Sequence, residues 1–134
     1  MDSFKVKSVR IKTAPEKAFQ YISDPNNLPE WTHAFEEVQN GKARMATPAG
    51  VVEVGLRVKA SPSEGTIDWE MTFPDGNVAR AYSRVIPDSD EYSVYSFILT
   101  APPVPLERLE GTLNEQARIL SEELAKLNAI LSTA

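Results

Sequence analysis

The chain contains a single histidine, His33, which stands between two aromatic residues in the pattern Trp31-x-His33-x-Phe35. Imidazole is the side chain that exchanges a proton most readily near neutral pH, so His33 is the candidate general acid or base. In an extended segment, residues two apart share a face, and all three rings would then point toward one pocket. The alternative is a loop or strand-edge histidine that bonds to backbone or water, and we favour this alternative.

Other catalytic and cofactor chemistries have little support in the sequence. A Ser-His-Asp triad would have to use His33, and there is no Gly-x-Ser-x-Gly turn to present its serine. Near His33, Glu36 and Glu37 are scattered carboxylates that lack the spacing of a metal site. The glycines form no phosphate-binding loop. We therefore expect no metal and no cofactor.

The elements that would position these residues begin with a strand over residues 4–12. The segment Thr13-Ala14-Pro15-Glu16 has the form of a capping box, with Thr13 as N-cap, and predicts a helix that ends at about residue 23. Asp24-Pro25 predicts the start of a second short helix, because Asp is a good cap and Pro suits a first turn. Pro29 is expected to end that helix.

Turn signatures such as Asn40-Gly41 and Asp75-Gly76 recur at regular intervals after Trp31. Short turns join antiparallel neighbours, so we expect a meander of antiparallel strands. The expected strands are residues 35–39, 42–47, 51–60, 65–73, 78–86 and 91–100.

The last part of the chain predicts one long helix over residues 105–132. Its apolar residues recur at spacings of three and four, which is the stripe that a helix buries. The stripe consists of Leu106, Leu109, Leu113, Ala117, Leu120, Leu124, Leu127 and Leu131. The predicted fold is α+β, in the order β-α-α-β6-α, with a seven-stranded curved antiparallel sheet. One helix cannot fill the concave side of such a sheet, so this layout predicts a cavity.

Alternation in the two central strands predicts which side chains face that cavity. Val52, Val54, Leu56 and Val58 share one face, and so do Ile67, Trp69, Met71 and Phe73. If Ala60 lies opposite Gly65, then Arg57 lies opposite Asp68 on the solvent face. We therefore interpret Asp68 as a surface salt-bridge partner and not as a catalytic carboxylate.

The strand over residues 78–86 has two possible registers, because a slip of one residue reverses every side chain. A two-residue turn at Asp75-Gly76 would form a cationic pocket by turning inward Arg80, Tyr82 and Arg84. A three-residue turn that includes Asn77 would instead turn inward Ala79, Ala81, Ser83 and Val85. We favour the second register, because it places Arg84 opposite Asp68 and leaves space among larger side chains.

Composition indicates a single domain over residues 1–134 and excludes several classes of partner. The 134 residues are 42% hydrophobic and 25% charged, with a net charge of -5. This negative charge disfavours binding to nucleic acid and to anionic membrane surfaces. The chain has no cysteine and no long apolar run. We expect a soluble, cytoplasmic protein that is a monomer or homodimer.

Three N-terminal segments resemble the START-like superfamily, also called SRPBCC or birch-pollen-allergen-like. They are Ala-Pro-Glu-Lys-Ala-Phe at 14–19, Tyr-Ile-Ser-Asp-Pro at 21–25 and Leu-Pro-Glu-Trp at 28–31. The chain looks most like the small bacterial polyketide cyclase/dehydrase-like members, and Leu-Ser-Glu-Glu-Leu at 120–124 agrees. The resemblance implies a helix-grip fold with a cavity under the last helix. Members bind lipids, hormones or polyketides, and some catalyse cyclisation, dehydration or hydrolysis, so the fold leaves the function open.

Our leading hypothesis is the binding of a hydrophobic or aromatic small molecule, lipid- or polyketide-like, in this cavity. Hydroxyls of Tyr95 and Ser83 and the imidazole of His33 would orient it, and Gln116 would either add an amide or be solvated. The alternative is a cyclase or dehydratase that uses His33 as general acid/base on a polyketide-like carbonyl compound. A third hypothesis is a protein partner on the outer face of the sheet, where a solvated surface is the simpler interpretation. The predicted cavity residues are Trp31, Phe35, Trp69, Met71, Phe73, Ser83, Tyr95, Phe97, Leu109, Leu113 and Gln116.

Overall fold

A computed structural model describes residues 4–47, 50–100 and 106–132 of the chain, while the side chains of 47 and 106–111 lie outside the described part. The helical elements are α1 (Pro15–Ser23), the 3-10 turn η1 (Pro25–Asn27), α2 (Leu28–Trp31) and α3 (Leu106–Leu131). The strands are β1 (Phe4–Ile11), β2 (Phe35–Gln39), β3 (Lys42–Thr47), β4 (Gly50–Ser61), β5 (Thr66–Thr72), β6 (Val78–Pro87) and β7 (Ser93–Thr100). These bounds lie within one or two residues of the predicted strands.

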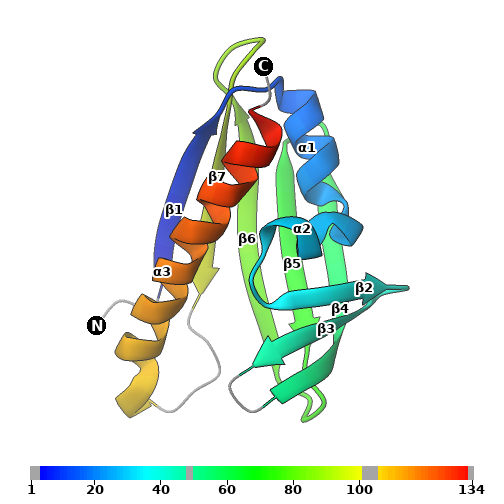
Figure 1. Cartoon of the computed structure of the whole chain (residues 1–134), viewed down its shortest axis with the longest axis vertical. Helices are drawn as coiled ribbons and strands as arrows, with labels where there is room; N and C mark the ends of the chain where they lie inside the picture. The colour runs from blue at the N-terminus through cyan, green and yellow to red at the C-terminus, as the bar shows by residue number, and fades with distance from the viewer. Residues whose placement is uncertain (1–3, 48–49, 101–105, 133–134) are drawn as a thin grey trace.

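The strands of the described part form one seven-stranded antiparallel sheet in the order β1-β7-β6-β5-β4-β3-β2. Consecutive strands pair through short turns, and β1 closes the order by pairing with the last strand, β7. All the helices lie on one side of this curved sheet, with α3 running along it beside β1 and β7 (Figure 1). The predicted α+β, helix-grip architecture is confirmed.

The short helices begin differently from the sequence prediction. The N-cap of α1 is Ala14, which makes no side-chain cap bond, so the predicted capping box on Thr13 is wrong. Pro15 occupies the first turn, where its fixed φ suits a helix and its missing N–H is not needed. Asp24 caps η1 as predicted and accepts a hydrogen bond from the backbone N–H of Asn26 at 3.0 Å. Pro29 lies in the first turn of α2 and does not end a helix there.

The hairpin between β4 and β5 has the predicted facing but a different register. Arg57 lies opposite Glu70, and Lys59 lies opposite Asp68, so the predicted pairing of Arg57 with Asp68 is wrong. The four-residue loop begins at Pro62 and ends at Gly65, because Gly65 takes the left-handed backbone conformation at φ +76°. The shift is an even number of residues, so every side chain keeps its predicted face.

The hairpin between β5 and β6 has a three-residue loop, as favoured, but the loop consists of residues 74–76 and not of the predicted 75–77. The loop is closed by a hydrogen bond from the Phe73 N–H to the Asn77 carbonyl at 2.8 Å. Arg84 lies opposite Thr66 and not opposite Asp68, so that predicted pair is also wrong. The inward facing is confirmed, since the structure buries Ala81, Ser83 and Val85 and exposes Arg80, Tyr82 and Arg84.

The apolar stripe of α3 packs on the inner face of the sheet. Leu113, Ala117, Leu120, Leu124 and Leu127 are buried. The helix is fixed at its C-terminal end, where Oγ of Ser132 accepts a hydrogen bond from the Lys12 N–H at 2.9 Å. Among the helices described, none is both long and apolar enough to cross a bilayer.

Candidate ligand-binding cavity

A cavity of about 90 Å³ lies between α3 and the inner face of the sheet. Every layer of the fold contributes to its wall, from α2 and the start of β2 across β4–β7 to α3. The lining residues are Leu28, Trp31, Thr32, Phe35, Leu56, Trp69, Met71, Ala81, Phe97, Leu120 and Glu123. A dry cavity of about 150 Å³ can hold benzene, so 90 Å³ accommodates a smaller group of heavy atoms.

Sheet register explains why space remains at this point. Ala81 lies directly between Trp69 on β5 and Leu99 on β7. A methyl group between larger side chains cannot fill the layer under α3, and the alternation of β6 makes Ala81 face inward. Trp69 and Ala81 are both buried, at 5% and 4% exposure. The hollow is therefore a consequence of one small residue in a row of large ones.

A closed hydrogen-bond network fixes the indole of Trp69 in this wall. Oγ of Ser83 accepts bonds from Trp69 Nε1 at 3.3 Å and from the Tyr95 hydroxyl at 2.9 Å, and it donates to the Ile67 carbonyl at 2.6 Å. Tyr95 is fully buried, which raises the pKa of its phenol above the ordinary value. We predicted that Ser83 and Tyr95 orient a ligand, but their hydrogens are already donated within the protein.

The aromatic residues predicted from the sequence mostly come together here. Trp31, Phe35, Trp69 and Phe97 line the cavity, together with Met71. Trp31 packs edge-on against Tyr95 at 6.4 Å, and its indole N–H finds no acceptor within the described structure. Five other predicted residues do not line this cavity: Ser83, Tyr95 and Leu113 are buried beside it or elsewhere, and Phe73 and Gln116 are partly buried. The side chain of Leu109 lies outside the described residues.

His33 lies outside the wall of the cavity. Its imidazole is 44% exposed, and Nε2 is 3.8 Å from a carboxylate oxygen of Glu122 on α3. The part of His33 that reaches the cavity region is its backbone, whose N–H donates to Oε2 of Glu123 at 2.8 Å. This bond ties the segment before β2 to α3, beside the cavity.

Glu123 is the lining residue that sequence reasoning missed. Desolvation raises the pKa of its carboxyl, and the His33 N–H bond and the charge of His33 offset this only in part, while Glu122 adds to the rise. The sequence did contain a signal that Glu123 lies near the cavity. Glu123 is three residues after Leu120 and one before Leu124, so it lies at the flank of the buried stripe of α3. Its neighbour Glu122 lies on the exposed face.

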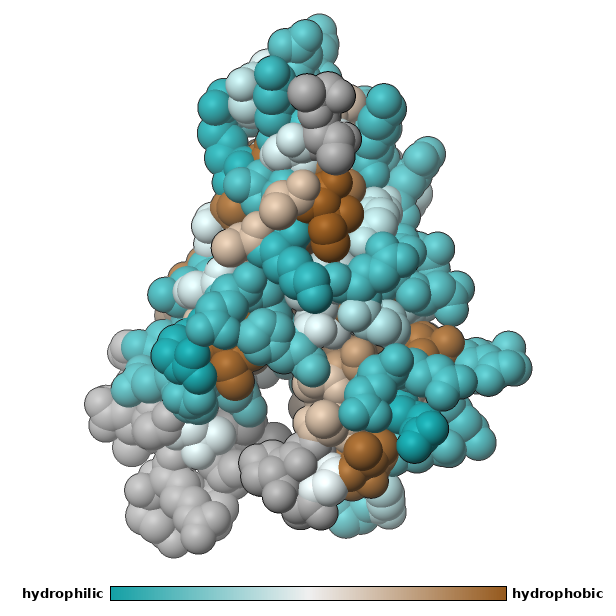
Figure 2. Space-filling view, in the orientation of Figure 1, coloured by the Kyte–Doolittle hydropathy of each residue, from teal (hydrophilic) through white to brown (hydrophobic). Residues whose placement is uncertain are grey.

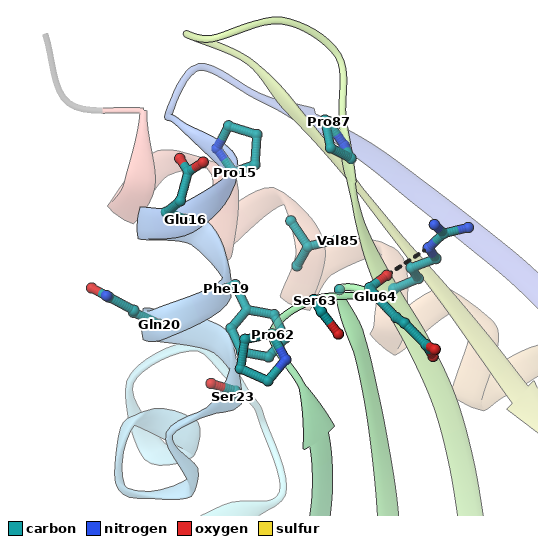
Figure 3. A pocket seen from close by; sticks show the side chains of 12 residues that line it. Pro15, Glu16, Phe19, Gln20, Ser23, Pro62, Ser63, Glu64, Val85 and Pro87 are labelled. Carbon is teal, nitrogen blue, oxygen red and sulfur yellow. Dashed lines mark hydrogen bonds between the residues drawn. The ribbon is translucent and has the colours of Figure 1, made fainter.

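A larger hollow of about 630 Å³ lies between α1, the β4–β5 turn and β6 (Figure 3). Phe19 and Pro62 both line it, while the Gln20 side chain points away from the sheet. Arg84 Nε donates to the Glu64 carbonyl at 3.0 Å along its side. Most of its lining residues are exposed, so a ligand there would lose little contact with water. We therefore assign the candidate site to the smaller, apolar cavity.

The surface view agrees with this assignment. In Figure 2, hydrophilic side chains cover most of the outer side of α3, and the molecule is hollowed between the lower part of α3 and strands β2 and β3. Apolar side chains border this recess on the strand side. Apolar surface therefore lies next to the space under the helix.

Comparison with known proteins identifies the family of this architecture. The family model described as polyketide cyclase/dehydrase and lipid transport matches residues 4–131. No protein of curated function matches significantly.

Several solved structures are similar in fold to this chain. XoxI from Bacillus cereus is 19% identical, with a TM-score of 0.72 and coverage of 97% of this chain and 96% of its own. A START superfamily protein from Mycobacterium smegmatis is 14% identical, with a TM-score of 0.66 and coverage of 96% and 98%. The Zhui aromatase/cyclase from Streptomyces sp. R1128 is 14% identical, with a TM-score of 0.62 and coverage of 96% and 90%.

At these identities, the structural likeness shows the fold alone. The family model spans nearly the whole chain, and the helix over the curved sheet is the architecture that the N-terminal and C-terminal motifs predicted. The chain therefore belongs to the polyketide cyclase/dehydrase and lipid transport family.

Proposed function

We propose that the protein binds a small hydrophobic or aromatic molecule in the cavity between the sheet and α3. The observation that carries this proposal is an apolar hollow of about 90 Å³ that the fold itself creates at Ala81. Burial of apolar surface contributes about 25 cal/mol per Å², and a preformed hollow avoids the cost of opening one. Aromatic walls suit flat or compact apolar groups.

Larger ligands, such as lipid- or polyketide-like molecules, need part of the wall to move. Met71 and Phe97 are among the partly buried members of the lining, so they can change rotamer at lower cost than the buried Trp31 or Trp69. The network on Ser83 holds Trp69 in place during such a change. The family description, which includes polyketide cyclisation and lipid transport, supports ligands of this size.

The geometry favours binding over catalysis by His33. A general base must come within hydrogen-bond reach of its substrate, and the His33 imidazole lies toward Glu122 and solvent. A cyclase or dehydratase reaction would thus require a movement of the segment that the His33–Glu123 bond fixes to α3.

The proposal is tested by NMR titration with two probes smaller than benzene, cyclopropane as a compact apolar ring and 1-propanol as a short aliphatic chain. The Ala81→Leu variant fills the hollow, and Arg57→Ala on the outer face is the control. We expect shifts of cavity residues in the wild type and in Arg57→Ala, and their loss in Ala81→Leu. Equal responses in all three proteins would contradict the proposal.

A further inference from the structure

Glu123 is unusual among the residues that line the cavity, because it is charged. The other residues of the described lining carry apolar side chains, except Thr32, whose hydroxyl donates to the Leu28 carbonyl at 2.6 Å. One carboxylate oxygen of Glu123, Oε2, accepts the His33 N–H at 2.8 Å. Within the described structure, the other oxygen has no hydrogen-bond partner. A residue that lines the cavity therefore keeps one carboxylate oxygen without a hydrogen-bond partner among the described residues.

The charge of Glu123 also has no lysine or arginine partner among the described residues. Arg118, on the same helix, is held by Glu115 at 2.6 Å and by Glu122 at 2.8 Å. Burying a charge without a partner is unfavourable, and the raised pKa of Glu123 agrees with such a position. A ligand cation would supply the missing partner.

The rest of the wall is suited to a cation with a carbon substituent. Trp31, Phe35, Trp69 and Phe97 line the same hollow as Glu123. The faces of aromatic rings attract cations, and indole attracts them most strongly. A volume of about 90 Å³ accommodates a compact branched alkyl group. An anionic ligand, in contrast, would meet the like charge of Glu123.

We propose that the cavity recognises small organic ammonium ions, with the Glu123 carboxylate as counter-ion and the aromatic rings around the carbon substituents. This inference rests on the proposed function, because it names the class of ligand that enters the same cavity. It also gives the His33 N–H a role, since that bond orients Glu123 toward a bound cation.

The test compares tert-butylammonium with tert-butanol, two probes of nearly the same shape that differ in charge. Affinities are measured by NMR titration for the wild type, for Glu123→Gln and for Glu36→Gln, an exposed glutamate on β2 that serves as the control. Gln keeps an oxygen that can accept the His33 N–H. We expect tert-butylammonium to bind about tenfold more tightly than tert-butanol in the wild type and the control. We expect this preference to disappear in Glu123→Gln, with the affinity for tert-butanol unchanged.

A pH series on the wild type gives a second test that needs no variant. The ammonium probe keeps its charge below about pH 9, so the preference for it should fall at acid pH as Glu123 gains a proton. The groups that act on Glu123 are His33 before β2, Glu122 on α3 and Tyr95 on β7. If Glu123 is the counter-ion, the His33→Gln variant should keep the pH-dependent preference.

The outcomes separate this inference from the proposed function. If tert-butanol binds in the cavity as tightly as tert-butylammonium in the wild type, the ammonium inference is overturned and the proposed function stands. If the preference survives Glu123→Gln or does not change with pH, Glu123 is not the counter-ion and the inference is also overturned. If neither probe perturbs the cavity residues at saturating concentration, both proposals fail.

Discussion

Replacing Ala81 by leucine is expected to stabilise the protein, although such changes usually overpack a core. Ala81 is only 4% exposed, yet it borders the 90 Å³ cavity between Trp69 and Leu99. At about 24 cal/mol for each Å³ of void, complete filling corresponds to about 2 kcal/mol. An imperfect rotamer subtracts about 1 kcal/mol, so we expect a gain of about 1–2 kcal/mol in the free energy of unfolding.

Urea denaturation measures this change, and Ala18→Leu is the matched control. Ala18 is fully buried on α1 and does not line the cavity, so the same substitution should cost about 1–3 kcal/mol by overpacking. The two variants are thus expected to change stability in opposite directions. Destabilisation of Ala81→Leu by as much as Ala18→Leu would refute the reasoning, because it would mean that no usable space exists beside Ala81.

Three further predictions concern the network, the turns and the carboxylate. Ser83→Ala leaves two buried donors, Trp69 Nε1 and the Tyr95 hydroxyl, without an acceptor and should lower the free energy of unfolding by about 2 kcal/mol or more. A loss under about 0.5 kcal/mol in urea denaturation would contradict the hydrogen-bond network. Gly65→Ala and Gly76→Ala both place alanine at positive φ, but only at Gly65 would the new Cβ collide with a backbone oxygen, that of Val85. Gly65→Ala should therefore have the lower Tm. Equal Tm values for the two variants would contradict the close packing of this turn. Burial raises the pKa of Glu123, so the contribution of this residue to stability is largest at low pH and falls as the pH rises through the raised pKa. The Tm of Glu123→Gln relative to wild type should therefore increase from about pH 4 to about pH 8. The control variant Glu36→Gln should not show this trend.

Turn glycines explain why the facing of the strands was predictable and the register was not. The sequence predicted the correct loop lengths, but it placed the loop after β4 one residue too early and the loop after β5 one residue too late. In both hairpins, a glycine at positive φ takes the last loop position, Gly65 in one and Gly76 in the other. Alternation fixes only which face a side chain takes, so an even shift in register leaves no trace in the hydrophobic pattern.

The candidate site was predictable where it depends on alternation, and it was missed where it depends on packing between distant elements. Trp69 and Phe97 follow directly from the period of their strands. Glu123 is partly buried where the backbone at His33 meets α3 and donates a hydrogen bond to it, a contact that no local pattern reveals. Likewise, Ser83 appeared free to contact a ligand until the structure placed Tyr95 within hydrogen-bond distance.

The most direct test of the central claim is a crystal structure under xenon pressure, because xenon enters small apolar hollows without any specific polar contact. We predict a xenon peak between the sheet and α3, bordered by Leu56, Ala81 and Leu120. A peak found only in the hollow beside Phe19 and Pro62, or no peak beneath α3 at saturating pressure, would contradict the claim that this space is a binding cavity.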